Sequence, residues 1–126
     1  MKEFRVILTN RPGELSRLAE NLSRRSVNIK ALAAIASGGQ VTLHLIGHDL
    51  EATRAGLQDM RAQFTEQEVI SLLLEDKAGE LARIANQLGS AGINLDAIYL
   101  TGKADELVEL AVAVDDVKKA KKVLGV

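Results

Sequence analysis

A long internal repeat constrains the fold of this chain more than any other feature of its sequence. Residues 10–32 are repeated without a gap as residues 76–98, so adding 66 to a residue number in the first copy gives its partner in the second. The identical pairs are Gly13 and Gly79, Glu14 and Glu80, Leu15 and Leu81, Arg17 and Arg83, Ala19 and Ala85, Leu22 and Leu88, Asn28 and Asn94, and Ala31 and Ala97. Because a repeat of this length defines one structural unit, the 126 residues are expected to form two small domains, 1–67 and 68–126.

Each copy carries the same order of apolar patterns. Strict alternation over residues 4–8 predicts a strand, and apolar spacings of three and four residues after it predict an amphipathic helix. A second strand, a hairpin at Gly38, a third strand and a helix capped by Asp49 or Asp116 follow. The residues expected in the cores are Phe4, Val6, Leu8, Leu15, Leu18, Leu22, Val41, Leu43, Leu45 and their copies. The second helix is expected to place four residues near one face, namely Leu50, Leu57, Met60 and Phe64.

The order strand, helix, strand, strand, helix, strand predicts an α+β fold. We expect two tandem ferredoxin-like βαββαβ units, each an antiparallel sheet with its helices on one face. Residues 65–68 would supply the last strand of the first unit, whereas that of the second unit is expected to be short or missing. Across the hairpin the offset between the copies grows from 66 to 67, which predicts one extra residue in the second hairpin loop.

Strand two predicts an association between sheets. Residues 31–35 are apolar without interruption, so both faces of this strand are apolar. The helix-free face of the sheet is therefore expected to be partly covered, by the sister unit or by a second chain. We expect a homo-oligomer, with sheets joined edge to edge or back to back.

Composition excludes several classes of function. The net charge is −1, so no overall field would recruit nucleic acid or an anionic membrane. The absence of cysteine excludes disulfides, thiolate metal sites and a cysteine nucleophile. No apolar run approaches the ~20 residues of a membrane helix, and residues 1–10 lack the apolar core of a signal peptide. We therefore expect a cytoplasmic protein.

Catalytic and metal-ligating groups do not converge in the sequence. His44 and His48 are four residues apart on an extended segment, about 13 Å, so they are too far apart to share a metal ion, and structural roles are favoured for both. The last helix carries a face of lysines that fits exposure to solvent, namely Lys118, Lys119, Lys121 and Lys122. We expect no catalytic residue, no metal site and no cofactor.

The turn before the first helix of each unit is the candidate binding site. A short glycine-containing turn leaves free backbone N–H groups at the helix N-terminus, where they can seat a carboxylate. Asn10 or Asp76 would cap the helix or meet an ammonium group, and Asp76 is the better partner by charge. Plain capping is the alternative, but strand two starts with Asn at the same spacing in both units. The candidate ligand-binding residues are Asn10, Arg11, Pro12, Gly13, Asn28, Ile29, Asp76, Lys77, Ala78, Gly79, Asn94 and Leu95.

The two turns, taken with the start of strand two, resemble the ACT domain family. The resemblance is carried by Asn10-x-Pro12-Gly13-x-Leu15 with Val27-Asn28-Ile29, and by Asp76-x-Ala78-Gly79-x-Leu81 with Gly92-Ile93-Asn94-Leu95. Residues 15–32 also resemble regulatory subunits of acetolactate synthase. The resemblance implies a ferredoxin-like regulatory module that binds amino acids between the turn of one domain and strand two of its neighbour. Asn10 replaces the family's usual Asp and Ala78 its usual Pro, so one site is expected to be weakened.

Three functions remain open from the sequence. The favoured one is a non-enzymatic sensor or regulatory subunit that binds a small ligand, above all an amino acid, at interfaces between units or chains. The second is a ligand-free module that drives oligomerisation or docks on an amino-acid biosynthetic enzyme such as acetolactate synthase. The third is a small enzyme, which is disfavoured because the titratable groups do not converge.

Overall fold

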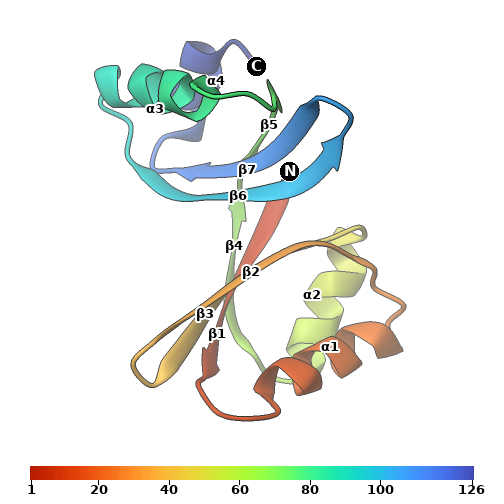
Figure 1. Ribbon diagram of the computed structural model, residues 1–126. Coiled ribbons are helices and arrows are strands. Elements are labelled where there is room, and N and C mark those ends of the chain that lie inside the picture. The colour runs from red at the N-terminus through yellow and green to blue at the C-terminus, as the bar shows by residue number, and fades with distance from the viewer. The chain divides into compact units, whose positions relative to one another are not determined.

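The computed structural model describes residues 1–126 and divides into two compact units. The N-terminal unit is Lys2–Gln67, and the C-terminal unit is Glu68–Val126 together with Met1. The N-terminal unit contains β1 (Lys2–Thr9), α1 (Glu14–Arg24), β2 (Ile29–Ser37), β3 (Gln40–Gly47), α2 (Leu50–Asp59) and β4 (Gln63–Glu68) (Figure 1). The C-terminal unit contains β5 (Ile70–Glu75), α3 (Glu80–Ser90), β6 (Leu95–Ala104), β7 (Leu107–Val114) and α4 (Val117–Leu124). None of the four helices has the length and hydrophobicity that a membrane span requires.

Both sheets have the strand order of a ferredoxin-like unit. The N-terminal sheet has the order β2-β3-β1-β4, and the C-terminal sheet has the order β5-β7-β6, with no fourth strand. In each unit the two helices lie on one face of the sheet (Figure 1). The strand pairs β1–β3, β2–β3, β5–β7 and β6–β7 are all antiparallel. The predicted fold class is therefore confirmed.

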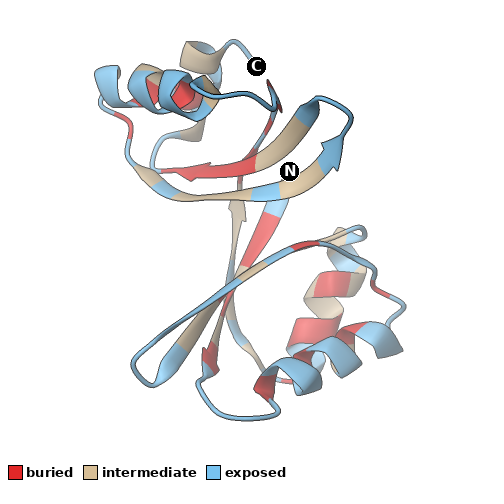
Figure 2. Ribbon diagram, in the orientation of Figure 1, coloured by how far each residue is buried: buried red, intermediate tan, exposed pale blue.

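The N-terminal core lies between the sheet and its helices. Alternation along β1 buries Phe4, Val6 and Leu8 on one face, and α1 adds Leu18 and Leu22. Each of these side chains loses nearly all contact with water, which is worth about 1.5–3 kcal/mol for a large apolar residue. The C-terminal core repeats this arrangement with residues from β5, α3, β7 and α4 (Figure 2).

The helix α2 is shorter than its apolar pattern predicts. It ends at Asp59 with Met60 as its C-cap, and the chain leaves through Arg61, whose φ is 55°. This left-handed conformation ends a helix. Phe64 therefore belongs to β4, where its ring meets that of Phe4 edge to face at a centroid distance of 5.7 Å. The prediction that Phe64 lies in the helix was wrong, but its side chain packs against the core.

Two residues that were predicted to be buried lie outside the cores. Leu15 and Leu81, in the first turns of α1 and α3, are 48% and 57% exposed. Helical spacing places them on the apolar side of the helix, but it says nothing of how far the opposing sheet extends along the helix axis. Each leucine lines an open cleft instead of a closed core.

The extra residue of the second copy lies in a strand and not in the hairpin loop. Both hairpins turn through two residues, Gly38–Gly39 and Asp105–Glu106. In β6 the pairing with β7 shifts between Leu100 and Gly102, so the bulged residue is Thr101. Its hydroxyl donates to Glu109, with a distance of 2.6 Å to Oε1. The loop prediction was wrong because a β-bulge absorbs one residue and leaves the turn unchanged.

Both units cap their second helix in the predicted way. Asp49 accepts a hydrogen bond from the backbone N–H of Ala52 at 3.0 Å. Asp116 accepts one from the backbone N–H of Lys119, also at 3.0 Å. A side-chain oxygen at this position satisfies one of the N–H groups that has no partner within the helix.

The helix-free face of the N-terminal sheet carries an exposed apolar side chain at the hairpin end of β2. Strand alternation places Ile46 and Ile35 on this face, opposite the core residues Leu43 and Leu45. Ile46 is buried, whereas Ile35 is 69% exposed. The apolar surface that the sequence predicted on strand two is therefore accessible at its hairpin end (Figure 2).

Candidate functional site

A small cleft opens in the N-terminal unit between the first turn of α1 and the strands beneath it. Its volume is about 290 Å³, near the lower end of the ~300–1,000 Å³ range of ligand pockets. Its apolar lining comes from β1, β2, β3 and α1, namely Leu8, Leu15, Ala34, Ala36, Val41 and Leu43. Its polar lining is Thr9, Asn10, Arg11 and Glu14, which form the turn and the start of the helix.

The C-terminal unit has a cleft in the same place, with a volume of about 340 Å³. Its apolar lining is Leu74, Leu81, Ile98, Tyr99, Leu100, Val108 and Leu110, and its polar lining is Glu75, Asp76, Lys77 and Glu80. Most of these residues are repeat partners of those around the first cleft. The repeat therefore preserves a cleft as well as a fold.

Backbone geometry shapes both turns in the same way. Gly13 and Gly79 are the N-caps of α1 and α3, with φ values of 87° and 91°. Only glycine adopts this left-handed conformation without strain. Neither helix has a side-chain cap, so the alternative that Asn10 or Asp76 caps the helix was wrong. Asn10 instead donates from its backbone N–H to Gly39 at 2.9 Å and from its side chain to the hairpin carbonyl of Gly38 at 3.3 Å.

A buried carboxylate stands at the rim of the first cleft. Glu14 is 7% exposed and binds two guanidinium groups. Arg11 approaches Oε1 with Nε at 2.9 Å and Nη2 at 2.8 Å. Arg17 approaches Oε2 with Nε at 3.1 Å and Nη2 at 3.0 Å. The hydrogen bond from Arg17, with that from Arg11, lowers the pKa of Glu14 below its usual range against the opposing effect of burial.

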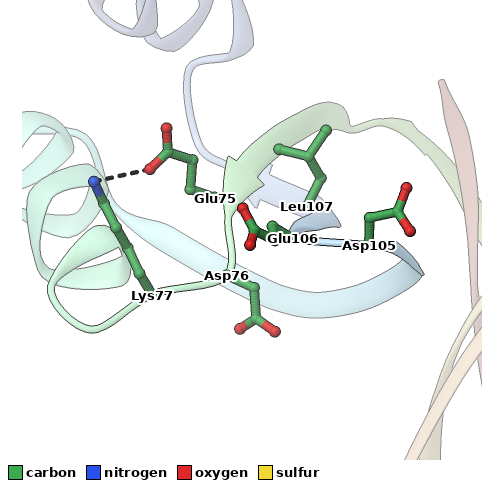
Figure 3. A pocket seen from close by; sticks show the side chains of 6 residues that line it. All are labelled: Glu75, Asp76, Lys77, Asp105, Glu106 and Leu107. Atoms are coloured by element: carbon green, nitrogen blue, oxygen red, sulfur yellow. Dashed lines mark ion pairs between the residues drawn. The ribbon is translucent and has the colours of Figure 1, made fainter.

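Each charged group at the second cleft has a partner of its own. Asp76 pairs with Lys103 at 2.7 Å, and Lys77 turns to Glu75 at 2.8 Å (Figure 3). Glu80 pairs with Arg83 at 2.7 Å. The hydrogen bond from Lys77 lowers the pKa of Glu75. Lys77 is the repeat partner of Arg11, but it faces the preceding strand and not the helix carboxylate.

A wider groove beside the second cleft follows the β6–β7 hairpin. It has a volume of about 860 Å³ and is lined by Glu75, Asp76, Lys77, Asp105, Glu106 and Leu107 (Figure 3). The backbone N–H of Asp76 donates to Glu106 at 2.6 Å, which ties the turn to the hairpin as Asn10 is tied to Gly39. The hairpin tip of the first unit, Gly38–Gly39, is uncharged, whereas that of the second unit, Asp105–Glu106, carries two acidic side chains.

The asparagines at the start of strand two lie far from the turns. Asn28 donates its backbone N–H to Nδ1 of His48 at 2.8 Å, and Asn94 donates to Asp115 at 3.1 Å. These contacts occur at the end of β3 or β7 that is remote from the hairpin. The turn and Asn28 are therefore separated by the length of β3, roughly 25 Å for a strand of this size. No single unit brings the two halves of the predicted site together.

The predicted site residues thus fall into three groups. Those that line a cleft are Asn10, Arg11, Asp76 and Lys77. Those that shape the turns without lining a cleft are Pro12, Gly13, Ala78 and Gly79. Those at the opposite end of the sheet are Asn28, Ile29, Asn94 and Leu95.

Sequence reasoning missed Glu14, Glu80 and the small residues Ala34 and Ala36, all of which line the clefts. The identity of Glu14 and Glu80 in the two copies was the available indication. Both histidines lie apart from the clefts. His44 contacts the buried carboxylate of Glu3 at 2.8 Å, and no group of three or more metal-ligating side chains is placed to hold a metal ion.

No protein-family model and no curated protein matches this chain, but several solved structures do. Protein BT0572 from Bacteroides thetaiotaomicron is similar with a TM-score of 0.89 at 20% identity, over 98% of this chain and 85% of that one. The α and β subunits of an aspartokinase match with a TM-score of 0.68 at 15% identity, over 98% and 88%. The regulatory subunit of aspartate kinase from Thermus thermophilus matches with a TM-score of 0.69 at 10% identity, over 98% and 89%. At these identities the similarity shows the fold.

Proposed function

We propose that this chain is a non-catalytic, cytoplasmic regulatory module of the ACT type that binds an amino acid. The observation that carries the proposal is the repeated cleft. In both units an apolar pocket of 290–340 Å³ lies directly beside a glycine turn and a helix start, with charged groups at its rim. This arrangement suits a small molecule with an apolar side chain and a charged head group.

The similar structures support a regulatory role. Two of them are described as an aspartokinase with its subunits and as the regulatory subunit of an aspartate kinase, and both cover nearly the whole of this chain. The proposed partner is accordingly an amino-acid biosynthetic enzyme. The two histidines do not line the clefts, which favours binding over catalysis.

Thermal unfolding in the presence of each of the twenty proteinogenic amino acids tests the proposal. Circular dichroism is the suitable readout, because the chain has no tryptophan and one tyrosine. A ligand at one hundred times its dissociation constant stabilises the folded state by about 2.7 kcal/mol. For domains of this size the melting temperature should rise by several degrees. If no amino acid raises it, the proposal fails.

A second candidate is a ligand-free association module, and the exposed apolar residues of β2 favour it. Leu32 and Ile35 are 40% and 69% exposed on this edge strand. Such residues on an edge invite pairing with another strand. Light scattering at micromolar concentration distinguishes the candidates. An oligomer that persists unchanged with every amino acid, together with no thermal shift, supports association alone.

A further inference from the structure

The rims of the two clefts carry opposite charge. At the first rim two guanidinium groups, those of Arg11 and Arg17, share the single carboxylate of Glu14, so one positive charge is left over. Thr9, Asn10 and the hairpin residues Gly38 and Gly39 add no charge.

At the second rim the charges of the paired groups cancel. The carboxylates of Glu75, Asp76 and Glu80 each have a partner cation, in Lys77, Lys103 and Arg83. The hairpin then adds Asp105 and Glu106, both exposed and beside the same turn (Figure 3). The second rim is therefore negative, and it would repel an anionic ligand.

Arg11 is the group at the first rim that is available to a ligand. Its side chain is 66% exposed, it lines the cleft, and it makes no polar contact other than with Glu14. Arg17 is more engaged, because its Nη1 also donates to the carbonyl oxygen of Met60 at 3.4 Å. Glu14 holds the Arg11 guanidinium by two of its nitrogens, so the group is fixed before a ligand arrives. A planar guanidinium held in this way suits a carboxylate.

The floors of the clefts also differ. Ala34 and Ala36 leave room under the first rim, and Leu8, Val41 and Leu43 complete an apolar surface. At the second cleft Leu100 stands where Ala34 stands in the first, with Tyr99 beside it. Both clefts have apolar space for an aliphatic side chain, about 290 Å³ in the first and about 340 Å³ in the second, but only the first has this space beside a cation that is not neutralised.

We propose that the first cleft alone takes the carboxylate of an aliphatic amino acid, with Arg11 as the residue that recognises it, and that the second rim rejects carboxylates. The proposal rests on amino-acid binding as the function of this chain. It assigns recognition of the carboxylate to a side chain that differs between the units, whereas the helix N-terminus is common to both.

Isothermal titration calorimetry on the full chain tests this assignment with three probes. These are L-leucine, L-leucinamide, which lacks the carboxylate charge, and isoamylamine, which lacks the carboxyl group altogether. We expect L-leucine to bind the unmodified chain with one site per chain and at least tenfold more tightly than either of the other two. Affinity for L-leucine should fall when the salt concentration rises, because the rim charge is exposed.

Variants at the rim locate the contact. Arg11→Gln should weaken L-leucine about tenfold and leave the weak binding of L-leucinamide unchanged. Arg11→Lys, which keeps the charge, should retain most of the affinity. The matched control is Arg24→Gln, which removes the same charge from the last turn of α1, about 15 Å further along the helix. Melting temperatures of the unliganded variants verify that each one folds.

The outcomes separate this assignment from the proposed function. If no amino acid binds, both are overturned. If L-leucine binds but Arg11→Gln and the unmodified chain bind it equally, or if L-leucinamide binds as tightly, only the assignment fails. Loss of L-leucine binding in Lys77→Gln and not in Arg11→Gln would place the carboxylate at the second rim and also overturn it. Binding of charged amino acids without L-leucine would contradict the aliphatic class.

Discussion

The N-terminal and C-terminal units have the same backbone fold but differ in the charged groups at their surfaces. Both place a glycine N-cap with nearly equal φ before an eleven-residue helix, and both cap their second helix with Asp. Their rims differ, because Arg11 and Lys77 occupy the same position yet turn to different carboxylates. The repeat has therefore kept the residues that set the fold, whereas the ion pairs at the two rims differ. Two clefts of one ancestry can thus have different chemistry.

Truncation of a core leucine should lower the free energy of unfolding by a similar amount in both units. This is the largest effect that we expect. Leu22 and Leu88 are repeat partners, and both are fully buried in their cores. Leu22→Ala and Leu88→Ala should each lower the free energy of unfolding by about 2–5 kcal/mol, because each leaves a cavity between helix and sheet. Urea denaturation measures this loss. The control Leu15→Ala, at an exposed position, should cost under about 1 kcal/mol. Equal losses at Leu15 and Leu22 would contradict the assignment of the core.

Acid should destabilise the two units to different extents. In the N-terminal unit the pKa values of Glu14, Asp59 and Glu66 are lowered, chiefly by hydrogen bonds from arginines. In the C-terminal unit the hydrogen bond from Lys77 lowers the pKa of Glu75. A lowered pKa stabilises the fold above the unfolded-state value of about 4, and this stability is lost as pH falls through the lower folded-state value.

The N-terminal unit should therefore lose more stability than the C-terminal unit between about pH 5 and pH 2. Amide resonances followed by NMR over this range report on each unit separately. The sharper version compares Glu14→Gln with Glu80→Gln. The first should reduce the acid sensitivity of its unit more than the second, because Glu14 is buried between two arginines. An earlier loss of C-terminal resonances would reverse the comparison.

The glycine turns should respond equally in both units. A Cβ at Gly13 or Gly79 would meet no atom within 4 Å, so the cost of alanine is conformational only. Gly13→Ala and Gly79→Ala should each lower the melting temperature by an amount that corresponds to about 1 kcal/mol. Gly102→Ala is the control, because this glycine has no left-handed φ and its added Cβ would make an ordinary contact at 3.8 Å. A difference of more than about 1 kcal/mol between the two turns would show that their backbones are not equivalent.

The bulge should be the least costly difference to remove. Deleting Thr101 would join Leu100 to Gly102, which already pair with consecutive residues of β7, so the ladder would become continuous from Ala97 to Ala104, as it is from Ala31 to Ser37 in β2. The expected loss is about 1 kcal/mol, from the hydrogen bond between Thr101 and Glu109. Urea denaturation measures it, and insertion of Thr between Ala34 and Ile35 is the reverse experiment. A deletion variant that fails to fold would show that the bulge is required.

The sequence by itself determined the repeat, the order of strands and helices, and the α+β class. These follow from hydrophobic periodicity and from glycine and aspartate at turns and caps. Such signals act over a few residues, so they can be recognised without knowing which distant segments pack together. Phe4, Leu18 and Leu22 were recognised as core in this way. Leu15 was not recognised as a cleft residue, because the same spacing describes a residue beneath the sheet and one beyond its end.

Only the tertiary structure decided which charges pair and where the extra residue lies. Arg11 and Lys77 differ little in sequence, but the groups within reach of each cation come from several elements of the fold. Asp76 was the preferred ammonium partner by charge alone, and its pairing with Lys103, 27 residues away, uses that charge within the protein. Thr101 is one residue among ten in β6, and only the register against β7 identifies it as the bulge. Long-range pairing depends on distances between segments, and a linear pattern does not contain them.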